Sequence, residues 1–361
     1  MSGRKQHFIP QSLLKGFAID PSSKIPQIWV FRDAASPYIS AIKDVAAQRD
    51  FYSPPVSDAI ETLDDRITSY ENHVGTLLVA LRATSHGTYV DARLASELTA
   101  HMCARGAPIR GLFHEGVNEM LAALELLIGD KNAWCAALGI EDSYLAAVVH
   151  KAIDEQITEI EQMNPLPAPR EFLHAYLYGR LRENSGDLHS QLSPMISDVL
   201  ARLRDAAPTA IRNGHAKALS AGLAPEARVN ELAHMRWTVQ FSQTDLILPD
   251  CVAIARAASG AWLPCQEHPE SLDVVVMPLG RRQLLIGHHG ADPLLDAPFV
   301  NAEAAGASVE FFVSASNSQL IDGLRAKIGH SPRQRMRDLA RQAVNDYAAP
   351  SAGTANDGAA A

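Results

Sequence analysis

The chain has 361 residues, 47% of them hydrophobic, and its 32 Lys and Arg against 41 Asp and Glu give a formal net charge of -9. This acidic balance argues against a protein that coats nucleic acid or an anionic membrane through its overall field, and leaves only a local basic patch open. No stretch approaches about 18 uninterrupted apolar residues, polar residues break the N-terminal apolar run, and the four cysteines are widely spaced, so we expect a soluble, cytoplasmic protein without disulfides.

The first elements form a small N-terminal lobe. A short helix is predicted to open at Pro10 or Gln11, because proline suits the start of a helix and an apolar stripe follows. A strand is predicted over 27–32, where β-branched and aromatic residues cluster, and a second extended piece around 39–42. We assign residues 1–56 to this α/β lobe.

Helical periodicity dominates residues 57–229. Apolar residues such as Ile60, Ile67 and Val74 recur at steps that place them on one helix face. Similar stripes run through 91–104, 112–128, 143–163, 171–182 and 191–205. Prolines between several of these stripes break the helices, so this region is typical of a bundle of roughly six helices.

Strands follow in residues 230–347. They are predicted over 236–241, 272–278, 283–287 and 308–313, with a hairpin turn between the second and the third. A terminal helix is predicted over 331–347, and the small residues of 348–361 predict a disordered tail. Together these elements predict an α+β fold in one domain over 1–347, with a large helical bundle packed on a mostly antiparallel β-sheet and the N-terminal lobe in the same core.

His7 is the first candidate for chemistry, because an imidazole near neutral pH can act as a general acid or base or bind a metal. The alternative is structural. His7 would then hydrogen-bond a neighbouring carbonyl while its apolar neighbours pack against the core.

An acidic cluster on the first long helix is the second candidate. Glu61, Asp64 and Glu71 are spaced so that their carboxylates project from a common face. Such oxygens could supply part of a magnesium or manganese site. Alternatively, acidic residues near the start of a helix only complement its dipole, although Glu71 lies too far along the helix for this explanation.

Arg105 and Arg110 flank a Gly/Pro interruption after the helix at 91–104. Guanidinium groups at a helix end can bind carboxylate or phosphate through two hydrogen bonds. They can equally fix a loop by donating to backbone carbonyls. Both interpretations remain open.

Two further features carry charge. Asp245 lies at the end of a predicted strand, where a carboxylate could take part in catalysis or metal binding or could cap the following loop in an Asx turn. Arg333, Arg337 and Arg341 form a stripe at four-residue steps in an otherwise acidic chain. They suit a solvated face with ion pairs or, alternatively, a phosphate-bearing partner such as nucleic acid.

These motifs also carry a family resemblance. The run from His7 to Gln11 with its Leu/Phe helix resembles the opening of the bacterial domain of unknown function 4238 family. The Arg105 to Arg110 segment and the stretch from Trp237 to Asp245 are similar to two further motifs of that family, and Asn301 resembles its asparagine after a Pro-Leu hairpin. The resemblance implies that Gln11, Trp237 and Asn301 belong with the ligand-binding candidates. It implies no reaction, because the family has no established activity.

Our functional hypothesis joins these residues. Since His7, Glu71, Arg105, Asp245 and Asn301 come from distant parts of the chain, we expect them to converge in one polar pocket for an anionic, phosphate-bearing ligand. A catalytic version would be a phosphoester hydrolase or nuclease, with His7 as acid or base and the carboxylates on a divalent metal. The alternative is a non-catalytic binding protein in which the same residues form a structural network.

Overall fold

The fold is α+β, as predicted. The computed structural model describes residues 5–49, 51–52, 63–137, 144–163, 168–257, 259–267, 271–293 and 295–348. These residues form helices together with antiparallel sheets. The chain divides into two compact units, unit 1 (Met1–His114 with Thr209–Arg335) and unit 2 (Glu115–Pro208 with the chain from Met336 on). The helical region predicted over 57–229 is therefore shared between both units. The predicted tail lies outside the described residues, apart from Ala348.

Three antiparallel sheets are built from the described strands. The strands are β1 (Lys5–His7), β2 (Gln27–Arg32), β3 (Tyr38–Ala41), β4 (Ala47–Arg49), β5 (Thr88–Val90), β6 (Arg236–Phe241), β7 (Ile247–Pro249), β8 (Ile254–Ala257), β9 (Trp262–Pro264), β10 (Leu272–Gly280), β11 (Gln283–His288) and β12 (Phe311–Ser314). The largest sheet has the order β5-β6-β11-β10-β8-β9, a second has the order β3-β2-β12-β7, and β1 pairs with β4. The expected hairpin is confirmed by the β10–β11 pair.

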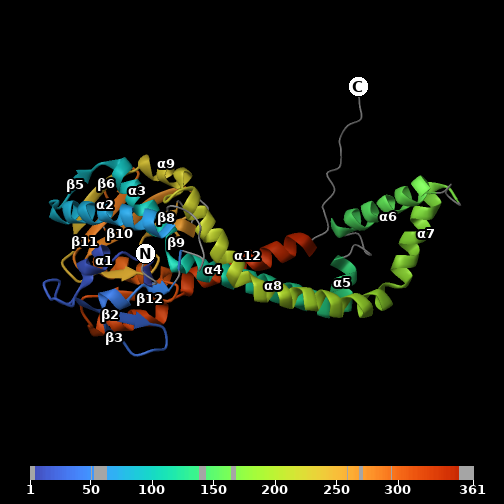
Figure 1. The fold of residues 1–361 in the computed structure, drawn as a ribbon, viewed down its shortest axis with the longest axis horizontal. Helices are drawn as coiled ribbons and strands as arrows, with labels where there is room; N and C mark the ends of the chain where they lie inside the picture. The colour runs from blue at the N-terminus through green and yellow to red at the C-terminus, as the bar shows by residue number, and fades with distance from the viewer. Residues whose placement is uncertain are drawn as a thin grey trace, which may run out of the picture. The chain divides into compact units, whose positions relative to one another are not determined.

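The helices of unit 1 cover these sheets (Figure 1). Those that lie wholly within it are α1 (Gln11–Leu14), α2 (Leu63–Ala83), α3 (Ala92–Ala104), α9 (Glu226–Ala233), α10 (Ala297–Ala307) and α11 (Gln319–Gly323), with short 3₁₀ turns η1 (Lys15–Phe17), η2 (Ile42–Asp44), η3 (Cys265–Glu267) and η4 (Leu324–Lys327). Helix α2 packs on β10 and α3 on β6, while α10 contacts β7, β8 and β9. Capping fixes the start of α3, because the Asp91 carboxylate accepts from the backbone N–H of Leu94 at 2.8 Å.

Unit 2 is helical. It contains α5 (Lys131–Ala137), α6 (Tyr144–Met163) and α7 (Arg170–Glu183), and it shares α4 (Ala107–Gly129), α8 (Ser185–Ala221) and α12 (His330–Ala348) with unit 1. Helices α6 and α7 pack on each other, and Arg170 on α7 donates to Thr158 on α6 at 2.8 Å. An ion pair of 2.9 Å between Arg204 and Glu125 links α8 to α4. None of the helices within the described residues has the length and apolar character needed to cross a membrane.

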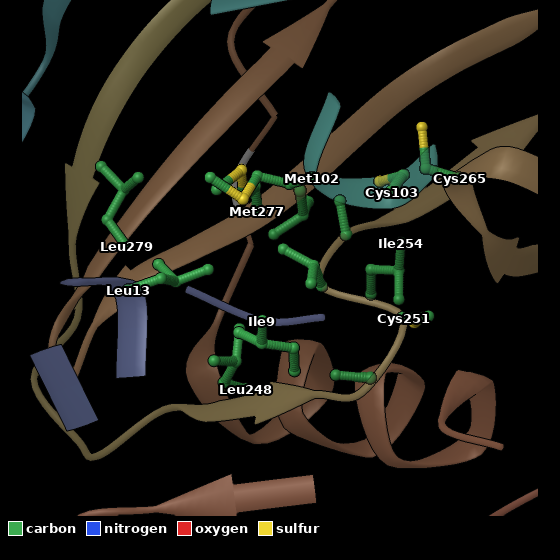
Figure 2. Close-up of a cluster of buried hydrophobic side chains, with 14 of the residues drawn as sticks. Ile9, Leu13, Met102, Cys103, Leu248, Cys251, Ile254, Cys265, Met277 and Leu279 are labelled. Carbon is green, nitrogen blue, oxygen red and sulfur yellow. The ribbon is translucent and has the colours of Figure 1, made fainter. Parts of the chain in front are cut away.

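The N-terminal motif lies inside the core of unit 1 and does not fray. Ile9 and Leu13 are completely buried and lie among side chains of β7, β8 and β10 (Figure 2). Arg82 on α2 fixes the motif from the other side, since its guanidinium donates to the carbonyls of Ser12, Leu13 and Leu279. The segment is therefore held by burial and by a charged clamp, although it lies near the end of the chain.

Three cysteines belong to this core. Cys103, Cys251 and Cys265 are free and buried. Cys103 and Cys265, far apart in the sequence, hydrogen-bond each other, and this contact together with burial raises the pKa of Cys103 well above its usual value. Buried free thiols of this kind pack like small apolar side chains.

Candidate functional site

Arg105 is the centre of a buried polar network in unit 1. It follows the last residue of α3, and its side chain has no exposed surface. Its Nη2 donates to the Glu71 carboxylate on α2 and to the carbonyl of His7. Its Nε donates to the Tyr52 hydroxyl at 3.2 Å, and that hydroxyl donates back to the Arg105 carbonyl at 3.1 Å. Three of the residues predicted to converge, His7, Glu71 and Arg105, are thus in direct contact.

The network keeps Arg105 charged. Burial alone would lower its pKa, but Tyr52 and Glu71 more than offset this effect, so the pKa of Arg105 is raised. Burial also raises the pKa of Tyr52, which therefore stays a neutral phenol. The Nε and Nη2 groups of the enclosed guanidinium donate to protein acceptors, whereas its buried Nη1 has no hydrogen-bond partner among the described residues. With no exposed surface, the guanidinium stabilises the fold around His7 more readily than it could bind an external anion.

His7 lies at the more open side of this network. Burial lowers the pKa of His7, against an opposing effect of the partly exposed Glu71 carboxylate, so the ring is mainly neutral at pH 7. The Gln11 amide donates to its Nε2 at 3.2 Å. A neutral imidazole at the edge of a polar network can accept a proton, which is the chemistry predicted for His7.

Gln11 connects His7 to a basic hollow of about 530 Å³. The polar side chains that line it are Gln11, Ser12, Lys15, Ser23, Lys24 and Lys43. No acidic side chain of the described part of the chain lines it, and none of its three lysines takes part in an ion pair among those residues. Helix α1, the loop before β2 and the turn η2 bring these residues together, although they are remote in sequence.

Asp245 and Asn301 form a second polar group. The Asp245 carboxylate accepts from Arg281 at 2.6 Å and from Arg282 at 3.4 Å, both in the turn between β10 and β11. Burial would raise the pKa of Asp245, but hydrogen bonds from Arg281 and Ser316 lower it below its usual value. Asn301 on α10 donates to the Asp245 carbonyl at 2.8 Å and accepts from the backbone N–H of Ile247 at 2.9 Å. This group fixes the loop that leads into β7.

Trp237 lies in the core. It is 1% exposed, and its Nε1 donates to the carbonyl of Leu232 at 3.0 Å. Its ring packs so closely on Gly287 of the neighbouring strand that a Cβ there would lie 2.8 Å from the indole. Trp237 thus fills the space between β6, β11 and α9.

Arg110 stacks over Phe51 with 3.7 Å between its guanidinium carbon and the ring centroid, and its Nε donates to His215 at 2.8 Å. His215 also donates to the Ala104 carbonyl at 2.7 Å, so both ring nitrogens are used. Burial lowers the pKa of His215 to about 4, which keeps it neutral. His215 lines a second, mostly apolar hollow of about 750 Å³ between α4, α8 and α9.

The predicted metal cluster is only partly described. Glu61 lies outside the described residues, Asp64 is buried and Glu71 is paired with Arg105. Within the described ranges, no group of three or more His, Cys, Asp or Glu side chains is arranged to hold a metal ion. The carboxylate of Glu71 therefore has a protein cation as its neighbour.

The predicted arginine stripe on α12 is divided between different surroundings. Arg333 is partly buried and donates to the Val309 carbonyl at 3.3 Å, and Arg337 lies 4.0 Å from Glu119. Arg341 is exposed. The first two side chains thus already have partners in the protein.

Sequence reasoning missed Tyr52, His215 and the lysine hollow. Tyr52 and His215 are single residues without a motif. The three lysines share no periodic pattern, so only the folded loops reveal them. The one available signal was that Lys15, Lys24 and Lys43 have no acidic residue at positions i±3 or i±4 except Asp20, which lies four before Lys24.

The model of a protein family of unknown function, DUF4238, matches residues 5–297. The chain belongs to the DUF4238 family. The match includes the N-terminal motif, the Arg105 network and Asp245, so the resemblance inferred from short motifs is confirmed over most of the chain. No curated protein and no solved structure matches this DUF4238 chain.

Proposed function

We propose that this DUF4238 protein binds a phosphate-bearing anion in the lysine hollow next to His7. The observation that carries the proposal is the lining itself, with three lysines, two serines and Gln11 around about 530 Å³ and no acidic side chain among its described residues. In a chain of net charge -9, such a concentration of positive charge attracts anions locally. Lysine is a common phosphate ligand, and the hydroxyl and amide groups can donate further hydrogen bonds. The sequence predicted an anion site at Arg105, whereas this proposal assigns the site to the lysine hollow.

The catalytic form of this proposal is phosphoester hydrolysis with His7 as general base. Its support is the position of His7, which Gln11 links to the hollow, and its lowered pKa, which leaves the ring able to accept a proton from water. The free, reduced state of Cys103, Cys251 and Cys265 supports action in the cytoplasm.

A second candidate is a non-catalytic protein in which the polar residues serve the fold. The specific observation in its favour is that Arg105 has no exposed surface and donates its hydrogen bonds to Glu71, Tyr52 and the His7 carbonyl. This candidate explains the conspicuous N-terminal motif without any ligand.

Titration calorimetry with inorganic phosphate and with a nucleoside monophosphate separates the candidates. The triple variant Lys15→Gln/Lys24→Gln/Lys43→Gln should weaken binding by about tenfold or more, since each charged contact contributes up to about 1 kcal/mol. The control Lys151→Gln/Lys217→Gln, which removes exposed lysines elsewhere, should bind like the wild type. No heat of binding with either ligand would contradict the proposal and favour the structural candidate.

Hydrolysis is tested separately with bis(p-nitrophenyl) phosphate, with and without Mg²⁺ or Mn²⁺. The variant His7→Ala should lose turnover while it retains phosphate binding. Wild-type turnover that His7→Ala leaves unchanged would contradict the role of His7 but not the binding site.

A further inference from the structure

Helix α7 of unit 2 has too little cover to be stable by itself. It spans 14 residues, all of them described, and none of them is buried. Phe172 is 63% exposed and Tyr176 55% exposed, one turn apart on the same face. Isolated helices of this length are marginal in water, and a helix normally buries its apolar stripe against a neighbour. Helix α6 contacts α7, but these two rings stay more than half exposed.

Helix α8 has a second apolar stripe next to the one it buries. Leu200 is 5% exposed and belongs to the inner face. Met195, Val199 and Leu203 follow one another at four-residue steps and are each more than half exposed. This spacing places them within one narrow face of the helix, about 80° from end to end.

The open apolar side chains of α7 and α8 are enough for a small interface. They are Phe172, Tyr176, Met195, Val199 and Leu203. At about 100 Å² for each side chain, they amount to about 500 Å² per copy, or about 1,000 Å² for two copies, which is the lower limit for a specific interface.

The charges on this surface indicate which partner covers it. Residues 170–208, which contain α7 and the unit 2 part of α8, carry five arginines and five Asp or Glu, a net charge of zero. A partner selected by charge would require an excess of one sign, whereas a balanced surface can meet an identical surface without repulsion. Two-fold pairing is also the commonest way for identical chains to associate.

We propose that unit 2 is a homodimerisation module whose α7 and α8 pack against the same helices of a second copy. With the two-fold axis near Val199, antiparallel α8 helices place Met195 of one copy opposite Leu203 of the other. Phe172 and Tyr176 then extend the apolar core of the interface at its end. This inference is independent of the lysine hollow, which lies in unit 1.

The test is the mass of the full chain in solution, by sedimentation velocity and light scattering across a range of micromolar concentrations. The wild type should have twice the 39.0 kDa mass of one chain. Val199→Glu/Leu203→Glu should be monomeric, because the contact would bury four carboxylates per dimer. Phe172→Glu/Tyr176→Glu should raise the dissociation constant at least tenfold.

The matched control is Ser197→Glu/Ala201→Glu, which adds the same charge to exposed positions on the opposite face of α8 and should remain dimeric. Circular dichroism must show equal helix content in all variants, and Phe172→Glu/Tyr176→Glu provides a second, independent disruption if the α8 variant unfolds. A monomeric wild type would overturn the proposal, and the exposed face of α7 and α8 would then be assigned to contact with a different protein. A dimer that survives both α7 and α8 substitutions would overturn it too.

Discussion

At the scale of single residues, Arg105 shows how a residue type that is common in anion sites can serve the fold instead. Its guanidinium lies between α2, α3 and the N-terminal strand, and every partner named above comes from the protein. Burying a cation destabilises the folded state unless acceptors and an opposite charge lie beside it. Glu71 and Tyr52 fill these roles for Arg105. The network thereby fixes the backbone that carries His7.

Replacing Arg105 should therefore be costly. We expect Arg105→Met to lower the free energy of unfolding by about 3 to 5 kcal/mol, because Tyr52 and the His7 carbonyl lose their partner. The measurement is urea unfolding followed by circular dichroism. The control Arg93→Met removes an exposed arginine paired with Glu97 and should cost less than about 1 kcal/mol. Equal effects of the two substitutions would show that the network contributes little to stability.

His101 makes stability depend on pH. It is buried on α3, where it donates to the carbonyl of Leu223 at 2.9 Å, and burial lowers its pKa to about 3 from 6.5. Below pH 6.5 the His101 imidazole binds a proton in the unfolded chain but stays neutral in the folded chain. The contribution of neutral His101 to the free energy of unfolding is therefore fully present above pH 6.5 and is lost as the pH falls towards about 3.

The variant His101→Asn keeps a donor for Leu223 but cannot titrate. Between pH 4 and 6, its unfolding free energy should change less steeply with pH than that of the wild type, by about 1.4 kcal/mol per pH unit. Urea unfolding at several pH values measures this difference. Parallel pH profiles would show that His101 is protonated as easily in the folded chain as in the unfolded one.

The meeting of His7, Glu71 and Arg105 was predictable from residue types and family motifs, but their roles were not. Sequence patterns cannot show that Arg105 points inward to Tyr52, or that Asp245 is held by Arg281. These outcomes depend on side-chain direction and on which loops fold over which elements. The lysine hollow was invisible for the same reason.

At the scale of elements, prediction succeeded where periodicity was strong. The strands predicted at 27–32 and 236–241 have the same bounds in the structure as β2 and β6, because β-branched and aromatic residues fill them. Strands β7 and β9 were missed. Each has three residues, all of them buried, so neither shows the alternation by which a strand is recognised. Helix α10 was missed as well, since its alanine-rich sequence has almost no polar face.

The packing of β6 on β11 leaves room only for glycine at 287. We expect Gly287→Ala to lower the unfolding free energy by about 1 to 3 kcal/mol, because its Cβ would lie 2.8 Å from the Trp237 ring. The near-ultraviolet circular dichroism of Trp237 should change at the same time. Gly214→Ala on α8 is the control. Nothing lies within 4 Å of its Cβ position, so it should be neutral or stabilising. An unchanged unfolding free energy in Gly287→Ala would show that the Trp237 ring can shift to make room for the methyl group.

At the scale of the whole molecule, the division into two units was not predicted, because its boundaries fall inside long helices. At His114 the apolar periodicity of α4 continues without a break from one unit to the other. At Thr209 the boundary follows Pro208, which was expected to break a helix but lies inside α8. A linker rich in Gly or Ser would have marked such a boundary in the sequence. Here the difference lies in what the helices pack against, which only the tertiary structure provides.

The two units should differ in local stability. Nearly all residues of β10 are buried in the middle of a sheet, whereas α7 buries none of its residues. In dilute protein we expect peptides from 170–183 to exchange their amide hydrogens at least a hundredfold faster than peptides from 272–280. Hydrogen exchange with mass spectrometry measures both in one experiment. Equal protection in dilute protein would indicate that α7 is covered within a single chain.

The four-stranded sheet also sets a condition on synthesis. Strand β2 lies between β3, which follows it directly, and β12, which is made about 280 residues later. Until residues 311–314 have left the ribosome, the nascent N-terminal lobe has an unpaired strand edge next to the apolar side chains of Ile28, Val30 and Phe31. Until then the unpaired edge of β2 favours pairing with the same edge of neighbouring nascent chains.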